Sequence, residues 1–273
     1  MTSLGAGLGA TAALTAGAFG ALWVASLLLR DASIVDVAWG PGFAAIAAIA
    51  FARSSGPGAR GSLLLAMAAL WGLRLGIHLA WRNIGSGEDP RYAAMRRRHG
   101  ARFARVSLVT VFALQAALMW TISLPLQVAM LRPGAAPLGA LDALGVALFA
   151  IGLSFEAIGD WQLARFRARP ESRGRVLDRG LWRYTRHPNY FGDSLAWWGM
   201  FAVAASTPLG PWTALSPALM TFLLLRVSGV PLLERSLARK RPGYGDYVAR
   251  TSAFLPLPPR RTPSSRVASS DRE

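Results

Sequence analysis

The stretch GLGATAALTAGAFGALWVASLLL, Gly7–Leu29, contains no charged side chain. About 20 apolar residues in a helix are enough to cross the hydrocarbon core of a bilayer. Residues 1–11 carry no Arg or Lys, and the apolar run is too long for the core of a signal peptide. We therefore expect this stretch to be the first of several membrane-spanning helices.

The composition of the whole chain agrees with that expectation. Of 273 residues, 53% are hydrophobic and 16% are charged, and long apolar runs recur to residue 233. Backbone groups in hydrocarbon must bond internally, so these runs should be helices. We predict an all-α, polytopic helix bundle in the cell's inner (cytoplasmic) membrane. Its seven expected transmembrane helices are 7–29, 33–52, 62–82, 106–130, 138–162, 189–206 and 211–233.

Arginine supplies nearly all of the positive charge, since Lys240 is the only lysine. The arginines gather in residues 82–105, in 165–186 and in the tail after Arg235. With seven spans these segments share one side, which the positive-inside rule makes cytoplasmic and which puts the N-terminus outside. Such segments also bind anionic lipid or phosphate. Because they form no single basic face, we expect no nucleic-acid partner.

We expect one transmembrane domain over residues 1–259, with a cofactor-binding half at about 138–259. Residues 260–273 mix Arg, Ser, Pro and Asp without periodicity, which predicts a disordered basic tail. The chain has no cysteine, and no second histidine stands at ligand spacing from His78, so we expect no metal site. The sequence does not indicate an oligomeric state.

Ionisable side chains inside apolar spans are costly and are functional candidates by default. Arg74, His78 and Arg82 follow one another at four-residue spacing, and Asp36 lies near the start of the second span. Two interpretations stay open. Asp36 and Glu156 neutralise arginines as structural pairs between helices, or the set lines a polar cavity in which a charged ligand meets an apolar one.

Small residues at four-residue spacing occur twice in the predicted spans. Gly72 and Gly76 form one pair and Gly5 and Gly9 form the other. Close packing of helices is the better explanation for both pairs.

The stretch DRGLWRYTRHPNYFGD, residues 178–193, carries the most information about function. Pro188 fixes the turn into the sixth span and needs no hydrogen-bond acceptor there. Arg179, Arg183 and Arg186 offer the forked donors that match phosphate, and the helix N-terminus adds partial positive charge. These features predict a pocket for an anionic cofactor at the cytoplasmic membrane face.

Three further residues of this stretch fit a sugar-bearing cofactor. Asn189 and Asp193 are one helical turn apart and can bond to a ribose or an amide. Gly192 would let a ligand approach the backbone. The alternative is an interfacial loop with aromatic anchors, for which Trp and Tyr are typical.

Residues 186–192, RHPNYFG, resemble the Arg-His-Pro-x-Tyr-x-Gly signature of the steroid 5α-reductase and sterol C14-reductase superfamily. The isoprenylcysteine carboxyl methyltransferases share the His-Pro-x-Tyr-x-Gly part of this signature, which we call the Arg-His-Pro corner. Bacterial steroid 5α-reductase-like proteins of unknown substrate look the most similar. The resemblance covers about residues 30–260, and its further matches are Val35–Gly40, Glu88–Tyr92, Arg96–Gly100, Gly243–Tyr247 and Arg250–Phe254.

The resemblance implies that NADPH binds in a cytoplasm-facing pocket formed by the later helices. Carried over by position, it places twelve residues of this chain near the cofactor, and Arg186, one of the phosphate donors named above, completes a set of thirteen candidates. They are Asp160, Arg167, Arg175, Arg179, Tyr184, Arg186, His187, Asn189, Tyr190, Asp193, Glu234, Tyr244 and Tyr247.

This chain departs from the steroid reductases at the substrate end. Those enzymes polarise the substrate ketone with a Glu and a Tyr on early helices. Here the five tyrosines, at positions 92, 184, 190, 244 and 247, lie outside the first four predicted spans. Trp71 stands about where that tyrosine is expected, and Asp36 can replace the Glu. A 3-keto-steroid substrate is therefore not indicated.

The leading hypothesis is an NADPH-dependent reductase of an activated C=C bond in a lipophilic, steroid- or isoprenoid-like molecule that enters from the bilayer. An acid must stabilise the developing enolate. The candidates are Asp36, Arg74, His78 and Arg82, with Tyr92 if its loop folds inward. The alternatives are an S-adenosylmethionine-dependent methyltransferase of a membrane lipid or isoprenoid, and a non-enzymatic lipid-binding membrane protein.

Overall fold

The computed structural model describes residues 3–83, 85–227, 230, 234 and 241–260, and these residues form helices and loops without a β-sheet. One isolated bridge joins Thr185 to Ser252. The predicted all-α class is confirmed. Five helical segments are long and apolar enough to cross a membrane, so the chain is a membrane protein. They are Leu4–Leu29, Ile34–Ala52, Gly58–Asn83, Pro90–Ile122 and Ala140–Arg167.

The last two predicted spans are not among these five segments. Residues 189–206 are helical as α9 (Pro188–Ala205). Residues 211–233 are helical through η5 (Gly210–Ala214), α10 (Leu215–Phe222) and η6 (Leu223–Val227), and most of the span beyond Val227 lies outside the described residues. The total of seven spans and the orientation therefore stay predictions. The predicted disordered tail also lies outside the described residues beyond Arg260.

The chain divides into two compact units. Unit 1 comprises Met1–Ala150 and Ala196–Met220, and unit 2 comprises Ile151–Leu195 and Thr221–Glu273. The helices α8 and α9 contribute to both. In chain order the helices are α1 (Leu4–Leu29), α2 (Ile34–Ala52), α3 (Gly58–Asn83), α4 (Pro90–His99), η1 (Gly100–Arg102), α5 (Phe103–Ser107), η2 (Leu108–Ala113), α6 (Leu114–Ile122), α7 (Leu124–Leu131), α8 (Ala140–Arg167), η3 (Pro170–Ser172), η4 (Gly180–Arg183), α9 (Pro188–Ala205), η5 (Gly210–Ala214), α10 (Leu215–Phe222), η6 (Leu223–Val227) and α12 (Tyr244–Arg250).

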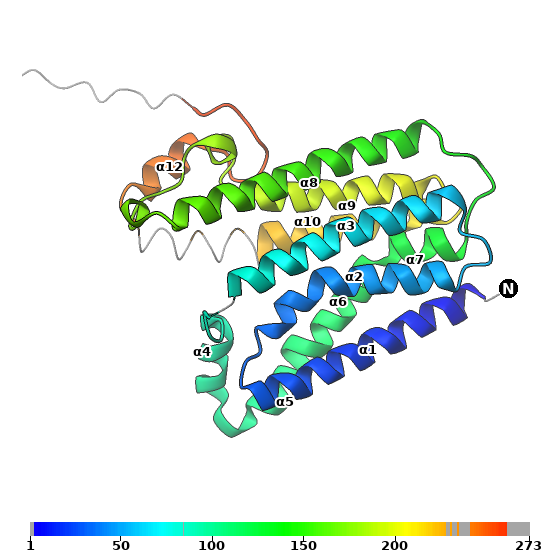
Figure 1. Ribbon diagram of the computed structural model, residues 1–273, viewed down its shortest axis with the longest axis horizontal. Helices are drawn as coiled ribbons and strands as arrows, with labels where there is room; N and C mark the ends of the chain where they lie inside the picture. The colour runs from blue at the N-terminus through cyan, green and yellow to red at the C-terminus, as the bar shows by residue number, and fades with distance from the viewer. Residues whose placement is uncertain (1–2, 84, 228–229, 231–233, 235–240, 261–273) are drawn as a thin grey trace, which may run out of the picture. The chain divides into compact units, whose positions relative to one another are not determined.

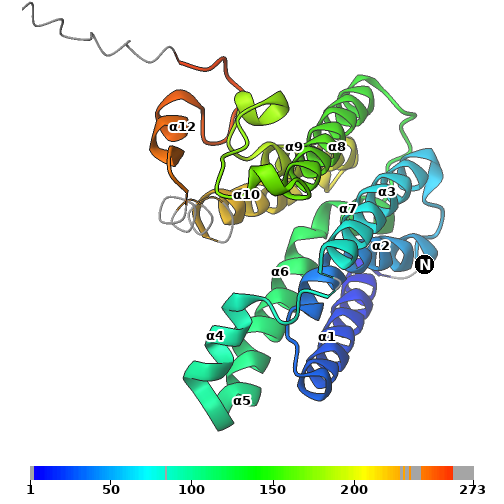
Figure 2. The ribbon, with the colours of Figure 1, turned by 60° about the vertical axis from the view of Figure 1, so that its left-hand side comes forward.

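Within unit 1, α1, α2 and α3 lie side by side (Figure 1, Figure 2). The closest approach is between α2 and α3, where a Cβ atom on Gly72 would lie 2.3 Å from the Gly40 carbonyl oxygen. A Cβ on Gly76 would lie 2.7 Å from the ring of Pro41. The predicted packing role of Gly72 and Gly76 is confirmed. It is wrong for Gly5 and Gly9, where an added Cβ would meet no atom within 4 Å among the described residues.

We expect Gly72→Ala to destabilise the protein, because the added methyl group must force two backbones apart. Overpacking of this kind typically costs about 1–3 kcal/mol. The measurement is the thermal unfolding midpoint of the purified protein in a neutral detergent. Gly9→Ala is the matched control, since its methyl group enters open space. Equal midpoints for the two variants would contradict the close approach of α2 and α3.

The fourth predicted span, 106–130, differs most from the structure. The long segment begins much earlier, at Pro90, passes through the π-helical turn η2 and ends at Ile122. A separate helix, α7, begins at Leu124 because Pro125 has no N–H with which to continue the ladder. The Ser216 hydroxyl donates to the Ile122 carbonyl oxygen that this break leaves open. The hydropathy pattern did not reveal this break.

A buried ion pair joins the start of α3 to the start of α8 within unit 1. The Arg60 guanidinium donates from Nε and Nη2 to the two carboxylate oxygens of Asp142, each at 2.8 Å. It also donates to the Ala136 and Pro137 carbonyl oxygens at 3.1 and 2.9 Å. Arg60 is 7% exposed and Asp142 is 3% exposed. Both side chains of the pair are therefore buried, and Arg60 holds the loop before α8 in place.

Candidate functional site

The two sets of predicted site residues separate between the two units. Asp36, Arg74, His78 and Arg82, the candidates for proton donation, all belong to unit 1. The thirteen candidate cofactor residues all lie in the ranges of unit 2. The chain thus keeps the predicted substrate chemistry and the predicted cofactor chemistry in different parts of the fold.

In unit 1 the loop helix α4 brings Tyr92 to Asp36. The Tyr92 hydroxyl donates to Asp36 Oδ1 at 2.8 Å, and Arg91 Nη2 donates to Asp36 Oδ2 at 2.9 Å. Tyr92 is only 7% exposed, whereas the Arg91 side chain is 53% exposed. Tyr92, proposed from the sequence on condition that its loop folds inward, does fold inward. Asp36 therefore pairs with Arg91 of this loop, which the sequence reasoning had not considered.

The Tyr92 hydroxyl is held from a second side by α6. Gln115 Nε2 approaches the Tyr92 oxygen at 3.4 Å, and Trp39 Nε1 donates to Gln115 Oε1 at 2.5 Å. Trp39 is about one turn beyond Asp36 on α2. The hydrogen bonds therefore run from Asp36 through Tyr92 and Gln115 back to Trp39 of the same helix. A phenol held in this way has a fixed position, and its one O–H is donated to Asp36.

Two acidic residues dock α4 against the turn between α1 and α2. Glu88 accepts from the Ala32 N–H at 2.9 Å and from Arg96 at 2.7 Å. The Asp89 N–H donates to Ser33 Oγ at 2.7 Å. Burial opposes ionisation of Glu88, but the hydrogen bonds from Arg96 and Ala32 outweigh it and lower the pKa of that carboxyl. A charged Glu88 thus anchors the loop that positions Tyr92.

The three candidate proton donors on α3 differ in burial. Arg74 and His78 are half-buried and have interaction partners, and the His78 ring is 6.2 Å from the ring of Trp81. Arg82 is exposed and donates to Asn83 Oδ1 at 3.3 Å. Of the four predicted donors, Asp36 is therefore the one that we find hydrogen-bonded to a buried phenol.

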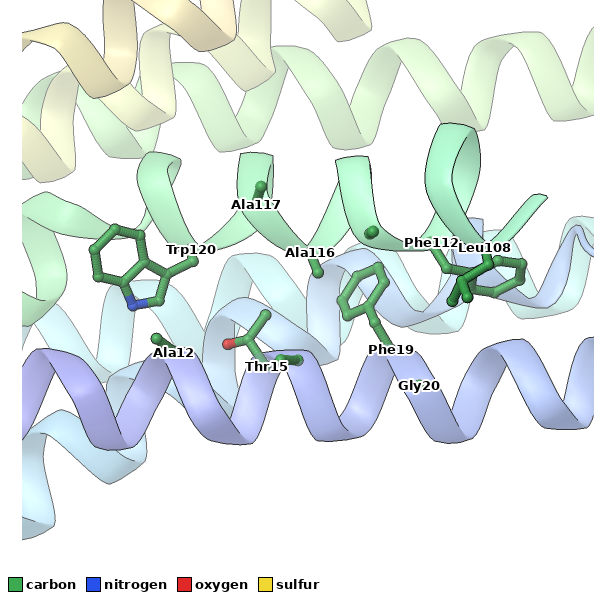
Figure 3. Close-up of a pocket in the computed structure, with 11 residues that line it drawn as sticks. Ala12, Thr15, Phe19, Gly20, Leu108, Phe112, Ala116, Ala117 and Trp120 are labelled. Atoms are coloured by element: carbon green, nitrogen blue, oxygen red, sulfur yellow. The ribbon is translucent and has the colours of Figure 1, made fainter. Parts of the chain in front are cut away.

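An apolar cavity of about 330 Å³ lies between α1 and the segment η2–α6 (Figure 3). Small side chains of α1 together with Phe19 form one wall, and Phe112, Ala116 and Trp120 belong to the other. Trp23 Nε1 donates to the Ala104 carbonyl oxygen and Trp120 Nε1 to Thr11 Oγ1, both at 3.1 Å. These two indole hydrogen bonds hold α1 against the α5–α6 segment, one near each end of the cavity. The cavity has the chemistry of a hydrocarbon site.

In unit 2 the Arg-His-Pro corner is built around Glu234. Arg186 Nε donates to Glu234 Oε1 at 2.8 Å, and His187 Nε2 lies 3.2 Å from the same oxygen. The Arg186 Nη1 group donates to the carbonyl oxygens of Val248 and Thr251. Burial opposes ionisation of Glu234, but the bonds to His187 and Arg186 prevail and lower its pKa to about 2. Arg186, expected to bind phosphate, here directs its donors at protein acceptors.

We expect Glu234→Gln to lower the stability of the protein in a pH-dependent way. The folded-state pKa of about 2 lies below the ordinary value of 4.5, so ionised Glu234 favours the folded state above pH 4.5. That advantage disappears as the pH falls from about 4.5 towards 2. The unfolding midpoints of wild type and variant should differ most at neutral pH and converge in acid. Glu171→Gln, at an exposed site, should show no such convergence.

The start of α9 brings several predicted residues together. Asn189 Nδ2 donates to Asp160 Oδ1 at 3.3 Å, and the Tyr190 ring stacks on His187 at 5.4 Å with an interplanar angle of 7°. Gly192 does not face a ligand, which corrects the expectation for it. A Cβ there would lie 2.5 Å from the Gly152 carbonyl oxygen, so the glycine serves the contact between α8 and α9.

The two tyrosines of α12 are buried, with ring centres 6.0 Å apart. The Tyr247 hydroxyl donates to the Trp182 carbonyl oxygen at 2.5 Å. Burial and the charge of Glu234 raise the pKa of Tyr244 to about 12, and burial with Tyr244 raises the pKa of Tyr247 further. Both phenols are therefore neutral hydrogen-bond donors at physiological pH.

Four other predicted cofactor residues are exposed, and Asp193 is half-buried with an interaction partner of its own. Exposed residues are accessible to a ligand, but they do not by themselves enclose one. The exposed residues are Arg167, Arg175, Arg179 and Tyr184.

A family model described as "Protein of unknown function (DUF1295)" matches residues 22–251. The match includes Tyr92, Asp36 and the Arg-His-Pro corner. No curated protein and no solved structure matches the chain.

Proposed function

The chain belongs to the family described as protein of unknown function DUF1295, and from that premise we propose that it is a membrane-embedded reductase. The reaction is NADPH-dependent reduction of an activated C=C bond in a lipophilic molecule. The resemblance of residues 186–192 to the steroid 5α-reductase superfamily supports this assignment. It also supports a cytoplasm-facing cofactor pocket in the inner membrane.

The hydrogen bond between Tyr92 and Asp36 is the main observation that supports the proposal. When a hydride adds to one carbon of an enone, negative charge develops on the carbonyl oxygen. A preorganised donor aimed at that oxygen lowers the barrier, and the effect is largest where water is excluded. Tyr92 is a buried phenol whose oxygen is fixed by Asp36 and Gln115. Its single O–H, which is donated to Asp36 in this structure, would turn from Asp36 to the carbonyl oxygen when the substrate binds. Transfer of a methyl cation from S-adenosylmethionine to a nucleophile has no need of such an acid.

The apolar cavity of unit 1 supports a lipophilic substrate. Ala116 and Ala117 line it, and they follow Gln115 of the hydrogen-bond chain directly on α6. At about 330 Å³ the cavity is near the lower end of the range of small-molecule sites. Its apolar walls would hold the hydrocarbon part of a substrate.

The donor set of unit 2 fits a nicotinamide nucleotide. The exposed guanidinium groups of Arg175 and Arg179 match phosphate, which they can bind through two parallel N–H bonds. Asn189 and Asp160, which are hydrogen-bonded to each other, are an amide and a carboxylate of the kind that can bond to a ribose or a carboxamide. NADPH, when bound, supplies the hydride. Arg186 acts through Glu234, which it holds against His187, so that the corner keeps its shape.

Calorimetric titration of the purified full-length protein with NADPH and with S-adenosylmethionine tests the proposal. We expect NADPH to bind and S-adenosylmethionine not to bind. Binding of S-adenosylmethionine alone would make the protein a methyltransferase, and binding of neither would leave a lipid-binding role. A panel of lipophilic enones, followed by the absorbance of reduced nicotinamide, then identifies the substrate class.

A further inference from the structure

The segment from the last turn of α8 to η4, residues 165–183, is strongly basic. Residues 165–183 contain only two acidic residues, Glu171 and Asp178, and Asp178 already faces Arg250 at 3.5 Å. All of the arginine side chains in this segment are exposed. They are Arg165, Arg167, Arg169, Arg173, Arg175, Arg179 and Arg183.

The apolar residues of the same segment force these arginines outward. Phe166, Leu177 and Trp182 form a small buried core against Leu163. The indole Nε1 of Trp182 donates to the Gly159 carbonyl oxygen at 3.1 Å, which anchors the core to α8. Because the apolar side chains are turned inward, the arginines between them face outward as a fixed array.

Turns at two glycines keep the segment folded back on α8. Gly174 and Gly180 have φ angles of 78° and 62°, a conformation that side chains other than glycine rarely adopt. The N–H of Leu181 donates to Gln162 Oε1 at 3.0 Å. The backbone that carries these arginines is therefore ordered before a ligand binds, and a ligand need not order the loop on binding.

The array begins where a membrane helix ends. The helix α8 is apolar enough to span a bilayer and stops at Arg167. Trp161 is 57% exposed near that end, and the Arg165 guanidinium carbon lies 5.4 Å from the centre of its ring. Exposed tryptophan is typical of the level of lipid headgroups. The arginines beyond Trp161 start at that level.

We propose that this arginine face, residues 165–183, binds the phosphate headgroup of an anionic phospholipid. Among the described residues no hydrogen bond or ion pair occupies the side chains of Arg169, Arg173 and Arg183. Clusters of four to eight basic residues next to a membrane helix attract anionic lipid with about 1 kcal/mol per residue, or roughly fivefold in affinity. Arg167, Arg175 and Arg179 of this face are also candidates for the cofactor, whereas Arg165, Arg169 and Arg173 are not, so the lipid site is tested at the latter three.

Titration of the full-length protein in a neutral detergent with short-chain lipids tests the site. Dioctanoyl phosphatidylglycerol is the anionic probe, dioctanoyl phosphatidylcholine the zwitterionic one and glycerol phosphate the soluble one. We expect phosphatidylglycerol to bind most tightly. The triple variant Arg165→Gln/Arg169→Gln/Arg173→Gln should weaken its binding roughly 100-fold, from fivefold per arginine. The corresponding triple lysine variant should keep most of the affinity.

The matched control removes the same charge elsewhere. Arg97→Gln/Arg98→Gln/Arg102→Gln replaces three exposed arginines of unit 1 and should weaken phosphatidylglycerol binding much less than the first triple variant does. An equal loss in both triple variants would mean attraction by net charge alone and would overturn a local site. Glycerol phosphate binding as tightly as the lipid would reassign the site to a soluble phosphate. NADPH affinity, measured on the same variants, separates this result from the reductase proposal.

Discussion

Replacing Tyr92 with phenylalanine should lower the rate of enone reduction about 100- to 1000-fold, the usual effect of losing one preorganised donor. The substitution removes the hydroxyl that donates to Asp36 at 2.8 Å and keeps the ring that fills the site. Because Tyr92 belongs to unit 1 and the predicted cofactor residues to unit 2, NADPH affinity should not change. Single-turnover oxidation of bound NADPH, compared with its dissociation constant, measures both effects.

Two further variants sharpen this experiment. Asp36→Asn keeps an acceptor for the Tyr92 hydroxyl but removes the charge that Arg91 neutralises, so its loss of rate should be smaller. Trp212→Phe changes an aromatic side chain that is 85% exposed and should have no effect. An unchanged rate in Tyr92→Phe would remove the tyrosine from the chemistry and return the role of acid to the residues of α3.

The variant Asp142→Leu should destabilise the protein by about 3–5 kcal/mol, the usual effect of leaving a buried charge without its partner. Arg60 is 7% exposed and directs two donors at Asp142. Loss of the carboxylate leaves the guanidinium with only the carbonyl oxygens of Ala136 and Pro137. Denaturant titration in detergent, followed by circular dichroism, gives the free energy of unfolding.

A second Arg–Asp pair of the same chain provides the comparison. Asp178 and Arg250 are 3.5 Å apart, but their side chains are 52% and 41% exposed. Exposed pairs contribute about 0–1 kcal/mol, so Asp178→Leu should have little effect. The double variant Arg60→Met/Asp142→Leu should recover part of the stability, since no lone charge remains buried. A double variant as unstable as Asp142→Leu would show that geometry, not charge, explains the loss.

The apolar helices could be predicted from the sequence because hydrocarbon leaves a segment of that length few alternatives. Residues 7–29 and 138–162 coincide closely with observed helices, α1 and α8. The fourth span was extended beyond the end of its helix at Ile122, because an average over hydropathy does not register the missing N–H of Pro125. How closely two helices pack depends on single atoms. At Gly72, for example, a hydrogen in place of a Cβ allows α3 to approach α2.

The site was predicted in part. Family resemblance brought together residues of unit 2 that contact one another, such as His187 and Glu234. The link between Tyr92 and Asp36 spans 56 positions of sequence and depends on how one loop folds. No periodicity encodes a contact of that kind. The motif Glu88–Tyr92 carried the signal, since its acidic residues dock the loop, but their partners became visible only in three dimensions.

The corner at Arg186 has a consequence for biosynthesis. Arg186 donates to the carbonyl oxygen of Thr251, a residue added 65 positions later, and the Leu257 N–H donates to the Tyr184 carbonyl oxygen. At about 5–20 residues per second, roughly 3–13 s separate synthesis of the corner from synthesis of Thr251. During translation the helices of unit 1 can insert and pair before the corner can close. A nascent chain stalled before residue 251 should therefore carry a membrane-inserted amino-terminal part and an incomplete Arg-His-Pro corner.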